Sequence, residues 1–432
     1  MRDESINSSM ELSHQMFSRI QPHYYLWRKL HGKNYISWLG PRPRLVVTEP
    51  QLVKEILNNK DEMYPKPEFE SYMIKLFGDG LVTTKVMITR VEMMLGRWRQ
   101  YENKEIDVWK EFKQLTSDVI SRTSFGSSYS EAQDIFDMIM ELLILASQNS
   151  FEVRIPLIKK FIKTKDDIES DKLEQRLRES ILKMIRKREE EAKMAEPDSH
   201  GSDFLGVLLK ANQDPNKSNK ISINDIVDEY KTFYIAGQET TSAALNWTIF
   251  LLAIHIDWQE KVRKEVLELF GRRNPTLNEI NKLKIMNMVV NETLRLYAPV
   301  TNLLREVPKG SKLGKLLAPA RMDILIPPLA VHHDPDIWGE DVHLFKPERF
   351  AEGVAKATKG NIGAFVPFSL GPRNCVGMNF AMTETKIALS MILQRYSFTL
   401  SPNYVHSPVV LIGVIPKKGL QITLQALEDQ SS

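Results

Sequence analysis

The feature that most constrains the fold is a helical pattern of apolar residues that runs without a break from Ser222 to His255. Ser222 can cap this helix, and Asp225 falls in its first turn, where a negative charge stabilises a helix start. At 1.5 Å per residue, a helix of this extent is on the order of 45 Å long. That length matches the width of a molecule of this size, so we expect the helix to cross the core.

The remaining apolar spacing is also mostly helical, and strand-like runs are short. We expect strands at Arg44–Thr48, Asp323–Ile326 and Val409–Leu424, each bounded or interrupted by Pro or Gly. From Lys165 to Ala195 both charge signs recur at helical spacing, which is typical of a solvated helix face. The sequence therefore predicts a mainly α fold with small β-sheets.

The composition excludes several classes of protein. With 42% hydrophobic and 26% charged residues, the chain is an ordinary globular sequence and not a disordered, collagenous or low-complexity one. Its net charge of +3 is too small to indicate nucleic-acid binding, although a basic patch could dock an acidic partner protein. No apolar run approaches the ~18 residues that would span a bilayer, so we expect no transmembrane segment in this sequence.

Cys375 is the only cysteine, which excludes an intramolecular disulfide and a multi-thiolate zinc site. It lies in Phe368–Gly377, here called the cysteine loop, which precedes an apolar helical pattern from Met378 to Leu393. Gly371 and Gly377 permit a tight loop whose N–H groups point at the sulfur, and the helix N-terminus also favours an anion. Both effects lower a thiol pKa, so we expect a thiolate suited to bind iron axially.

Arg373 lies two residues before this cysteine and suits a haem propionate. The alternative is a free cysteine that packs as a small hydrophobic residue, which is the usual fate of a lone cysteine. The flanking glycines and the arginine argue against that alternative.

The middle of the long helix carries the motif Ala236–Thr241. Its central Gly237 costs about 1 kcal/mol relative to Ala, and threonine hydroxyls compete for backbone carbonyls, so the helix is locally weakened. The missing side chain leaves room for a small ligand, and Glu239 and Thr240 offer a proton source beside it. The alternative is a close helix–helix crossing with a polar rim, which is the better interpretation of this motif taken alone.

Two further segments carry paired charges. Glu292 and Arg295 are three residues apart and share a helix face, although such pairs on solvated faces contribute only about 0.2–0.5 kcal/mol. Arg349, in the segment Lys346–Phe350, could complete a three-member ionic network if the fold brings it to Glu292.

Together these motifs resemble those of the cytochrome P450 family, the haem-thiolate monooxygenases. The cysteine loop matches the family pattern Phe-x-x-Gly-x-Arg-x-Cys-x-Gly at every fixed position. Ala236–Thr241 is similar to the oxygen-binding helix motif, Glu292 and Arg295 to the Glu-x-x-Arg pair, and Pro347–Phe350 to the Pro-Glu-Arg-Phe segment. Four motifs in the expected order are highly specific.

The resemblance covers roughly the whole chain from Trp38 onward. Leu329–Pro335 and Ile415–Gly419 resemble most the plant clan that includes secologanin synthase and brassinosteroid-inactivating hydroxylases. It implies a single catalytic domain over residues 1–432, with a long central helix over haem and an N-terminal β-rich lobe.

The resemblance also implies haem b as the cofactor. Cys375 would be the proximal iron ligand, pushing electron density toward the O–O bond. Thr240 and Glu239 would deliver protons to dioxygen, and Ala236 and Gly237 would leave room for it.

Other roles follow from the same resemblance. Arg373 and Arg305 would bind haem propionates, and Phe368 would pack beside the thiolate in a loop shaped by Gly371 and Gly377. A buried structural network on the proximal side would consist of Glu292, Arg295 and Arg349.

Two neighbouring histidines, His332 and His333, could indicate a metal site. Because adjacent side chains point apart in a strand, we interpret them as structural. Candidate substrate contacts are Phe233 and the stretch Ala298–Leu303, although both could equally belong to the core.

The implied activity is oxygen insertion from O2 into a lipophilic small molecule such as an isoprenoid. Electrons would come from NADPH through NADPH-cytochrome P450 reductase, and no nucleic acid is involved. The resemblance further implies a monomer on the cytosolic face of the endoplasmic reticulum membrane.

Two departures from the family matter. Its N-terminal membrane-anchoring helix is absent from this sequence, and so is the third helix with Trp-x-x-x-Arg, which binds a propionate. Gly80–Lys85 runs directly into Val86–Arg90 at that place. The only Trp-x-x-x-Arg joins Trp38 to Arg42 across Gly-Pro, which cannot form one helix face.

Losing two propionate donors and a pocket wall would cost a few kcal/mol each, so we expect impaired haem binding. One alternative is therefore a non-catalytic haem-binding remnant. A second is an O2-independent haem-thiolate isomerase, which would have no use for the proton relay of Thr240 and Glu239.

Overall fold

The structure is a computed structural model that describes residues 9–40, 42–58, 63–66, 80–126, 129–149, 164–194, 201, 203–213, 220–411 and 413–427. The chain forms two compact units. The larger unit consists of Met1–Met73, Val91–Phe112 and Thr240–Ser432, and the smaller unit of Ile74–Arg90 and Lys113–Glu239.

Three helices contribute residues to both units: α5 (Gly80–Trp98), α6 (Val108–Phe125) and α11 (Ile223–Ile254). The other described helices are α2 (Phe17–Ile20), α3 (Pro22–His31), α4 (Pro50–Asn58), α7 (Tyr129–Asn149), α9 (Lys165–Met194), α10 (Phe204–Asn212), α12 (Ile256–Phe270), α13 (Leu277–Ile280), α14 (Lys284–Leu296), α15 (Pro328–His332), α16 (Pro335–Trp338), α17 (Val354–Ala357) and α18 (Met378–Leu393). Short 3₁₀ helices lie at Arg99–Tyr101 (η2), Pro347–Phe350 (η3), Ile362–Ala364 (η4) and Gly371–Arg373 (η5).

The described strands are β1 (Asn34–Leu39), β2 (Arg42–Val47), β3 (Glu105–Asp107), β4 (Leu303–Val307), β5 (Ser311–Leu313), β6 (Leu316–Ala318), β7 (Met322–Ile326), β8 (Tyr396–Leu400), β9 (Pro408–Val410), β10 (Val414–Pro416) and β11 (Gln421–Ala426). The predicted mainly α fold with small sheets is confirmed.

The long helix α11 begins and ends within one residue of the predicted bounds. Its start is a capping box, because the Ser222 amide donates to Asp225 Oδ2 at 2.7 Å and the Asp225 amide donates to Ser222 Oγ at 3.1 Å. In the larger unit, Trp247 of α11 is fully buried, donates its indole N–H to Val414 O at 2.6 Å and stacks on Tyr297. This half of the helix therefore lies in the core.

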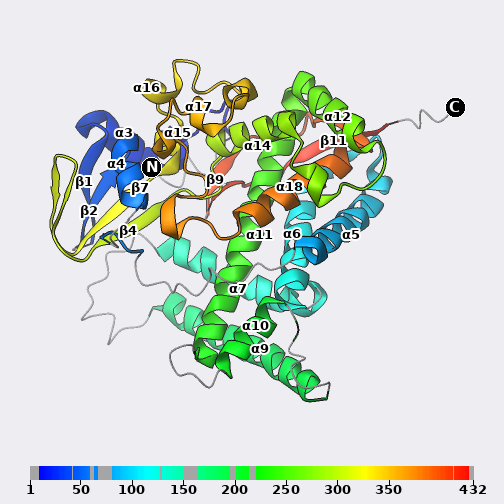
Figure 1. Ribbon diagram of the computed structural model, residues 1–432, viewed down its shortest axis with the longest axis horizontal. Coiled ribbons are helices and arrows are strands. Elements are labelled where there is room, and N and C mark those ends of the chain that lie inside the picture. The colour runs from blue at the N-terminus through cyan, green and yellow to red at the C-terminus, as the bar shows by residue number, and fades with distance from the viewer. Residues whose placement is uncertain are drawn as a thin grey trace. The chain divides into compact units, whose positions relative to one another are not determined.

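The four-stranded sheet of the larger unit has the order β1-β2-β7-β4 (Figure 1). The strands predicted at Arg44–Thr48 and Asp323–Ile326 are β2 and β7, which pair in parallel with Arg44 opposite Asp323. β1 and β4 add antiparallel strands on the two sides, so β4 is an edge strand.

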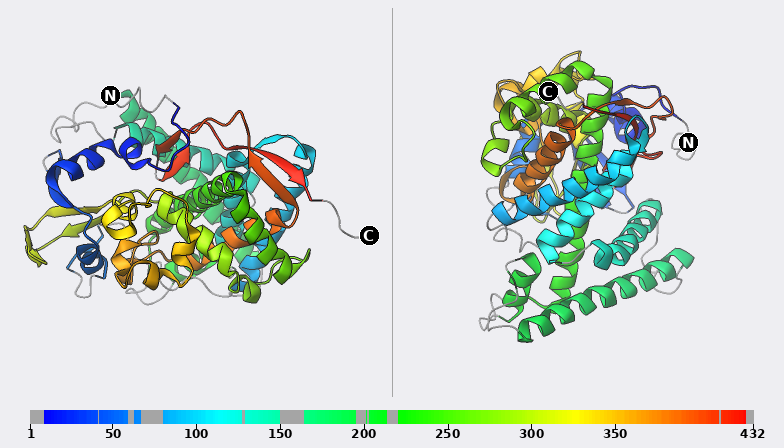
Figure 2. Two further views of the ribbon diagram at one scale, coloured as in Figure 1. Left: turned by 90° about the horizontal axis from the view of Figure 1, so that it is seen from above. Right: turned by 90° about the vertical axis from the view of Figure 1, so that its right-hand side faces the viewer.

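The strand expected at Val409–Leu424 is instead three short strands, β9, β10 and β11. β9 and β10 form a hairpin, and Gly419, with a φ of +78°, turns the chain before β11. β11 pairs with β8 and β3, and Figure 2 shows β8 and β11 side by side in red near the C-terminus.

In the smaller unit, α9 confirms the predicted solvated helix. Its buried side chains recur every fourth residue, at Leu173, Leu177, Ile181 and Ile185. Within the described ranges, none of the helices combines the length and apolar character that crossing a bilayer requires.

Candidate active site

The cysteine loop is held in one conformation by backbone contacts. The Cys375 amide donates to Phe368 O at 2.8 Å, which closes the loop ahead of α18. Gly371 has a φ of +70°, and a Cβ there would lie 2.3 Å from Leu57 O, so only glycine fits against the end of α4. Gly377 is different, because a Cβ there would meet only Cys375 Sγ at 4.0 Å.

Burial of the Cys375 thiol opposes the two effects that favour a thiolate there. Although Cys375 is exposed as a residue, desolvation by the surrounding loop raises the pKa of its thiol. The Gly377 N–H and the positive charge of Lys66 lower that pKa but do not outweigh the desolvation. The loop alone therefore favours the thiol, and a bound metal cation would favour the thiolate.

Arg305 supplies the test of whether an anionic cofactor fits this site. It lies on β4, is only 1% exposed, and donates to Leu304 O at 2.8 Å and to Ser369 Oγ at 3.4 Å. Its Nε has no hydrogen-bond partner among the described residues. Burial and the nearby Arg373 lower the pKa of this guanidinium to about 10. A buried cation without an anionic partner is unfavourable, and a haem propionate could supply the missing negative charge.

Lys66 belongs to the same group of charges and was not predicted from the sequence. Burial, Arg305 and Arg373 lower the pKa of its ammonium group, whereas Cys375 raises it. No sequence motif includes this lysine. Its position relative to the cysteine loop depends on how the sheet between the two segments folds, which a local motif does not show.

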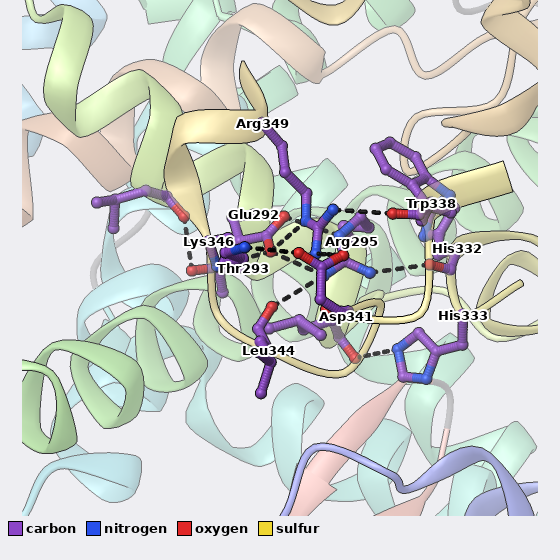
Figure 3. A network of polar contacts seen from close by, with 12 residues as sticks. Glu292, Thr293, Arg295, His332, His333, Trp338, Asp341, Leu344, Lys346 and Arg349 are labelled. Carbon is purple, nitrogen blue, oxygen red and sulfur yellow. Dashed lines mark hydrogen bonds and ion pairs between the residues drawn. The ribbon is translucent and has the colours of Figure 1, made fainter. Parts of the chain in front are cut away.

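The buried ionic network forms within the larger unit (Figure 3). Glu292 and Arg295 are fully buried and share two hydrogen bonds of 2.7 Å. Arg349 Nε lies 3.5 Å from Glu292 Oε1, and the Lys346 amide donates to the same oxygen at 3.0 Å. Arg295 also donates to His332 O at 3.0 Å. The network therefore ties α14 to η3 and α15.

The two histidines have structural partners. His332 Nε2 accepts from the Val366 amide at 3.0 Å, and His333 Nε2 contacts Leu296 O at 3.0 Å. Burial lowers the pKa of His332 to about 3, so it is neutral. The prediction that these residues lie in a strand is wrong, because Pro328 starts the short helix α15 there.

The oxygen-motif residues of the smaller unit pack against α6. A Cβ at Gly237 would lie 2.5 Å from Ile120 Cδ1, and Thr116 Oγ1 donates to Gln238 O at 3.2 Å. Glu239 forms an ion pair with Lys113. This is the close helix crossing that the sequence left open, and it leaves Ala236 exposed.

Thr240 is half-buried and belongs to the larger unit. Phe233, a candidate substrate contact, is buried and stacks on Phe204, so it packs in the core of the smaller unit. In the stretch Ala298–Leu303, Thr301 is buried and its carbonyl accepts from Gln21 at 3.3 Å.

The segment that departs from the family is helical. Arg90 of α5 donates to Asp118 Oδ2 at 3.0 Å, so its guanidinium is already paired. Trp38 and Arg42 lie on the antiparallel strands β1 and β2, and Trp38 is exposed. As expected, these two side chains do not share a helix face.

The chain is similar to known proteins over nearly its whole length. The family model described as Cytochrome P450 matches residues 72–423. Cytochrome P450 CYP749A22 of Panax ginseng is 53% identical over 454 residues, which cover 99% of this chain and 86% of that protein. Secologanin synthase 2 of Catharanthus roseus is 35% identical over 466 residues, which cover 100% of this chain and 88% of the relative.

Both alignments are longer than the 432 residues of this chain, so these relatives have residues inside the matched span that it lacks. A solved structure, retinoic acid bound cyanobacterial CYP120A1, has a TM-score of 0.81 at 23% identity and covers 96% of each chain. The fold is therefore the same.

Proposed function

The chain belongs to the cytochrome P450 family, and we propose that it transfers one oxygen atom from O2 to a lipophilic small molecule, with electrons from NADPH that arrive through a flavoprotein reductase. Family and fold imply haem with a cysteine thiolate as axial ligand. The observation that carries the proposal is the cysteine loop beside the buried Arg305, which lacks an anionic partner among the described residues.

Haem, when bound, supplies the iron at which dioxygen is activated. Cys375 would hold that iron, and the Gly377 N–H stabilises negative charge on the sulfur. Arg305 and Arg373 would hold the propionates and so orient the ring. Glu239 and Thr240 would hold and pass protons on the side of α11, with Lys113 fixing the carboxylate of Glu239.

The direct test is the spectrum of the purified chain after addition of hemin, reduction and exposure to carbon monoxide. We expect a Soret band at the position of a thiolate-ligated haem, and we expect Cys375→Ala to abolish it. Turnover with NADPH and a plant reductase then separates a monooxygenase from a haem-thiolate isomerase, which would convert its substrate without either reductant or O2.

A second candidate is an impaired haem-binding remnant. It is favoured by the missing Trp-x-x-x-Arg and by the extra residues that the relatives carry inside the matched span. A thiolate-type spectrum without any turnover over a broad substrate panel would favour this candidate.

For the substrate we propose an isoprenoid of plant secondary metabolism, because the relatives include a protein named for making secologanin. Titration with a panel of terpenoids, followed by the shift of haem to high spin, tests this class. Fatty acids of matched size serve as the control, and a shift with the fatty acids alone would contradict it.

We further propose a monomer at the cytosolic face of the endoplasmic reticulum membrane. Exposed Leu26 and Leu30 on α3 and Trp38 on the adjoining β1 support contact with a lipid surface, and Lys29 adds a positive charge. Flotation with vesicles that contain anionic lipid tests this location, and Leu30→Asp/Trp38→Asp should reduce the bound fraction.

A further inference from the structure

We propose that Lys66 is a third haem-binding cation, which together with Arg305 and Arg373 neutralises the two propionates and replaces charge that the Trp-x-x-x-Arg helix would supply. This inference rests on the haem binding proposed above. It names a residue outside all the family motifs of this sequence.

The backbone fixes where Lys66 lies. Tyr64 is buried in the cluster that contains Leu57 and Val307, and its hydroxyl lies 3.2 Å from Ser311 Oγ. Pro65 O accepts a hydrogen bond from the Glu306 amide at 2.8 Å. The segment Tyr64–Lys66 is therefore attached to β5 through the Tyr64 side chain and to the edge strand β4 through the Pro65 backbone.

This attachment places the backbone at Lys66 beside the strand that carries the buried Arg305. Arg305 precedes Glu306, and Lys66 follows Pro65, so each cation is one residue from the same hydrogen bond. Arg305 reaches Ser369 in the cysteine loop, and that loop packs through Gly371 against the end of α4. The segment after α4, the edge strand and the cysteine loop thus meet in one place within the larger unit.

The group of charges is positive and unbalanced. In the part of the chain that the structure describes, no carboxylate forms an ion pair with Lys66, Arg305 or Arg373. The nearest acid along β4, Glu306, faces the other side of the strand and lies 3.9 Å from Arg42. Arg305 is buried and Lys66 is exposed, and like charges close to one another are unfavourable unless an anion joins them.

Haem would bring two propionates to this group of charges, because the positive charge of the iron porphyrin is neutralised by the Cys375 thiolate. Lys66 adds a third cation to Arg305 and Arg373 around these two carboxylates.

The test compares hemin with hemin dimethyl ester, whose propionates carry no charge. Wild type, Lys66→Ala and Lys66→Arg are each loaded with either compound, and the dissociation constant is measured by transfer to apomyoglobin. Lys309→Ala, at an exposed lysine in the turn after β4, is the matched control.

We expect Lys66→Ala to weaken hemin binding about tenfold, since a charge-assisted hydrogen bond contributes on that scale. Lys66→Arg should stay within about twofold of wild type, and Lys309→Ala should match it. With the dimethyl ester, all four proteins should bind equally. The melting temperature of the hemin-free Lys66→Ala protein should not fall, because the substitution removes repulsion.

Equal hemin affinity of Lys66→Ala and wild type would overturn this inference while leaving the proposed function intact. An equal loss with hemin and with the ester would also overturn it, because the effect would then be structural. If wild type binds no hemin through Cys375, the proposed function fails together with the inference.

Discussion

Lys113 Nζ lies 3.1 Å from Glu239 Oε1, and the carboxylate side chain is only 4% exposed. The pair joins α6 to α11 within the smaller unit, and Glu239 lies two residues along α11 from the crossing at Gly237. A carboxylate that the family resemblance assigns to proton delivery is therefore held by a lysine from another helix, so its removal has structural as well as catalytic consequences.

The first prediction concerns this pair. Lys113→Met leaves a buried carboxylate without its cation, so we expect it to lower the free energy of unfolding by about 2–3 kcal/mol. Glu239→Gln should lower the free energy of unfolding by a smaller amount. The double variant should lose less than the sum of the two single losses, with a coupling energy of about 1–2 kcal/mol. Urea denaturation of the hemin-free proteins measures the three free energies of unfolding, and strictly additive losses would contradict the ion pair.

The crossing at Gly237 gives the second prediction. Ala is a better helix former than Gly by about 1 kcal/mol, but its Cβ would overlap Ile120 Cδ1 at 2.5 Å. We expect Gly237→Ala to destabilise the fold by about 1–2 kcal/mol. Gly96→Ala on α5 is the matched control, because nothing lies within 4 Å of its Cβ position, and it should stabilise. A gain in stability at both positions would refute the close crossing.

Local patterns in the sequence predicted a good part of this structure. The capping box at Ser222, the apolar period of α11 and the Glu292 and Arg295 spacing are local signals, and the structure has all three features. The ion pair of Lys113 and the position of Lys66 next to β4 were not predictable in this way. The surroundings of each lysine depend on which distant segment of the chain packs against it, and no local periodicity or motif in the sequence indicates that segment.

The thiol of Cys375 shows a different limit. The glycines and the helix N-terminus correctly indicated a tight loop, but the balance between desolvation and hydrogen bonding depends on how closely the loop is covered. That balance raises the thiol pKa, in the direction opposite to the one expected from the motif. Only the packed structure determines which effect is larger.

The buried network supplies the third prediction. Glu292→Gln leaves Arg295 fully buried beside a neutral amide, so we expect a loss of about 3–5 kcal/mol in the free energy of unfolding. Glu268→Gln on α12 breaks an exposed pair with Lys264 and should change stability by less than about 0.5 kcal/mol. Similar effects of the two substitutions in urea denaturation would show that the network adds no stability.

Glu384 on α18 leads to a prediction about pH. It is 1% exposed, neither carboxyl oxygen has a hydrogen-bond partner among the described residues, and burial raises its pKa well above 4.5. The folded state therefore keeps it protonated, whereas the unfolded chain releases the proton above about pH 4.5. Stability should fall as the pH rises from there toward the folded pKa, by up to about 1.4 kcal/mol per pH unit.

The variant Glu384→Gln cannot ionise, so its free energy of unfolding should lack this decline and should exceed that of wild type at pH 8. Urea denaturation between pH 4.5 and pH 8.5 measures both curves. Glu268→Gln, at an exposed position, should keep the wild-type slope. Parallel curves for wild type and Glu384→Gln would show that Glu384 is ionised in the folded protein.

The last prediction separates stability from cofactor binding at Arg305. Burial and the nearby Arg373 oppose this charge in the hemin-free chain, so Arg305→Met should leave the free energy of unfolding unchanged or raise it by about 1 kcal/mol. The same substitution removes a propionate donor and should weaken hemin binding about tenfold or more. Lys312→Ala, at an exposed position on β5, should change neither quantity. A purely structural arginine would produce the reverse pattern, with lost stability and an unchanged hemin dissociation constant among the molecules that remain folded. The opposite signs of the two effects therefore identify Arg305 as a residue whose charge is useful only when an anion is bound.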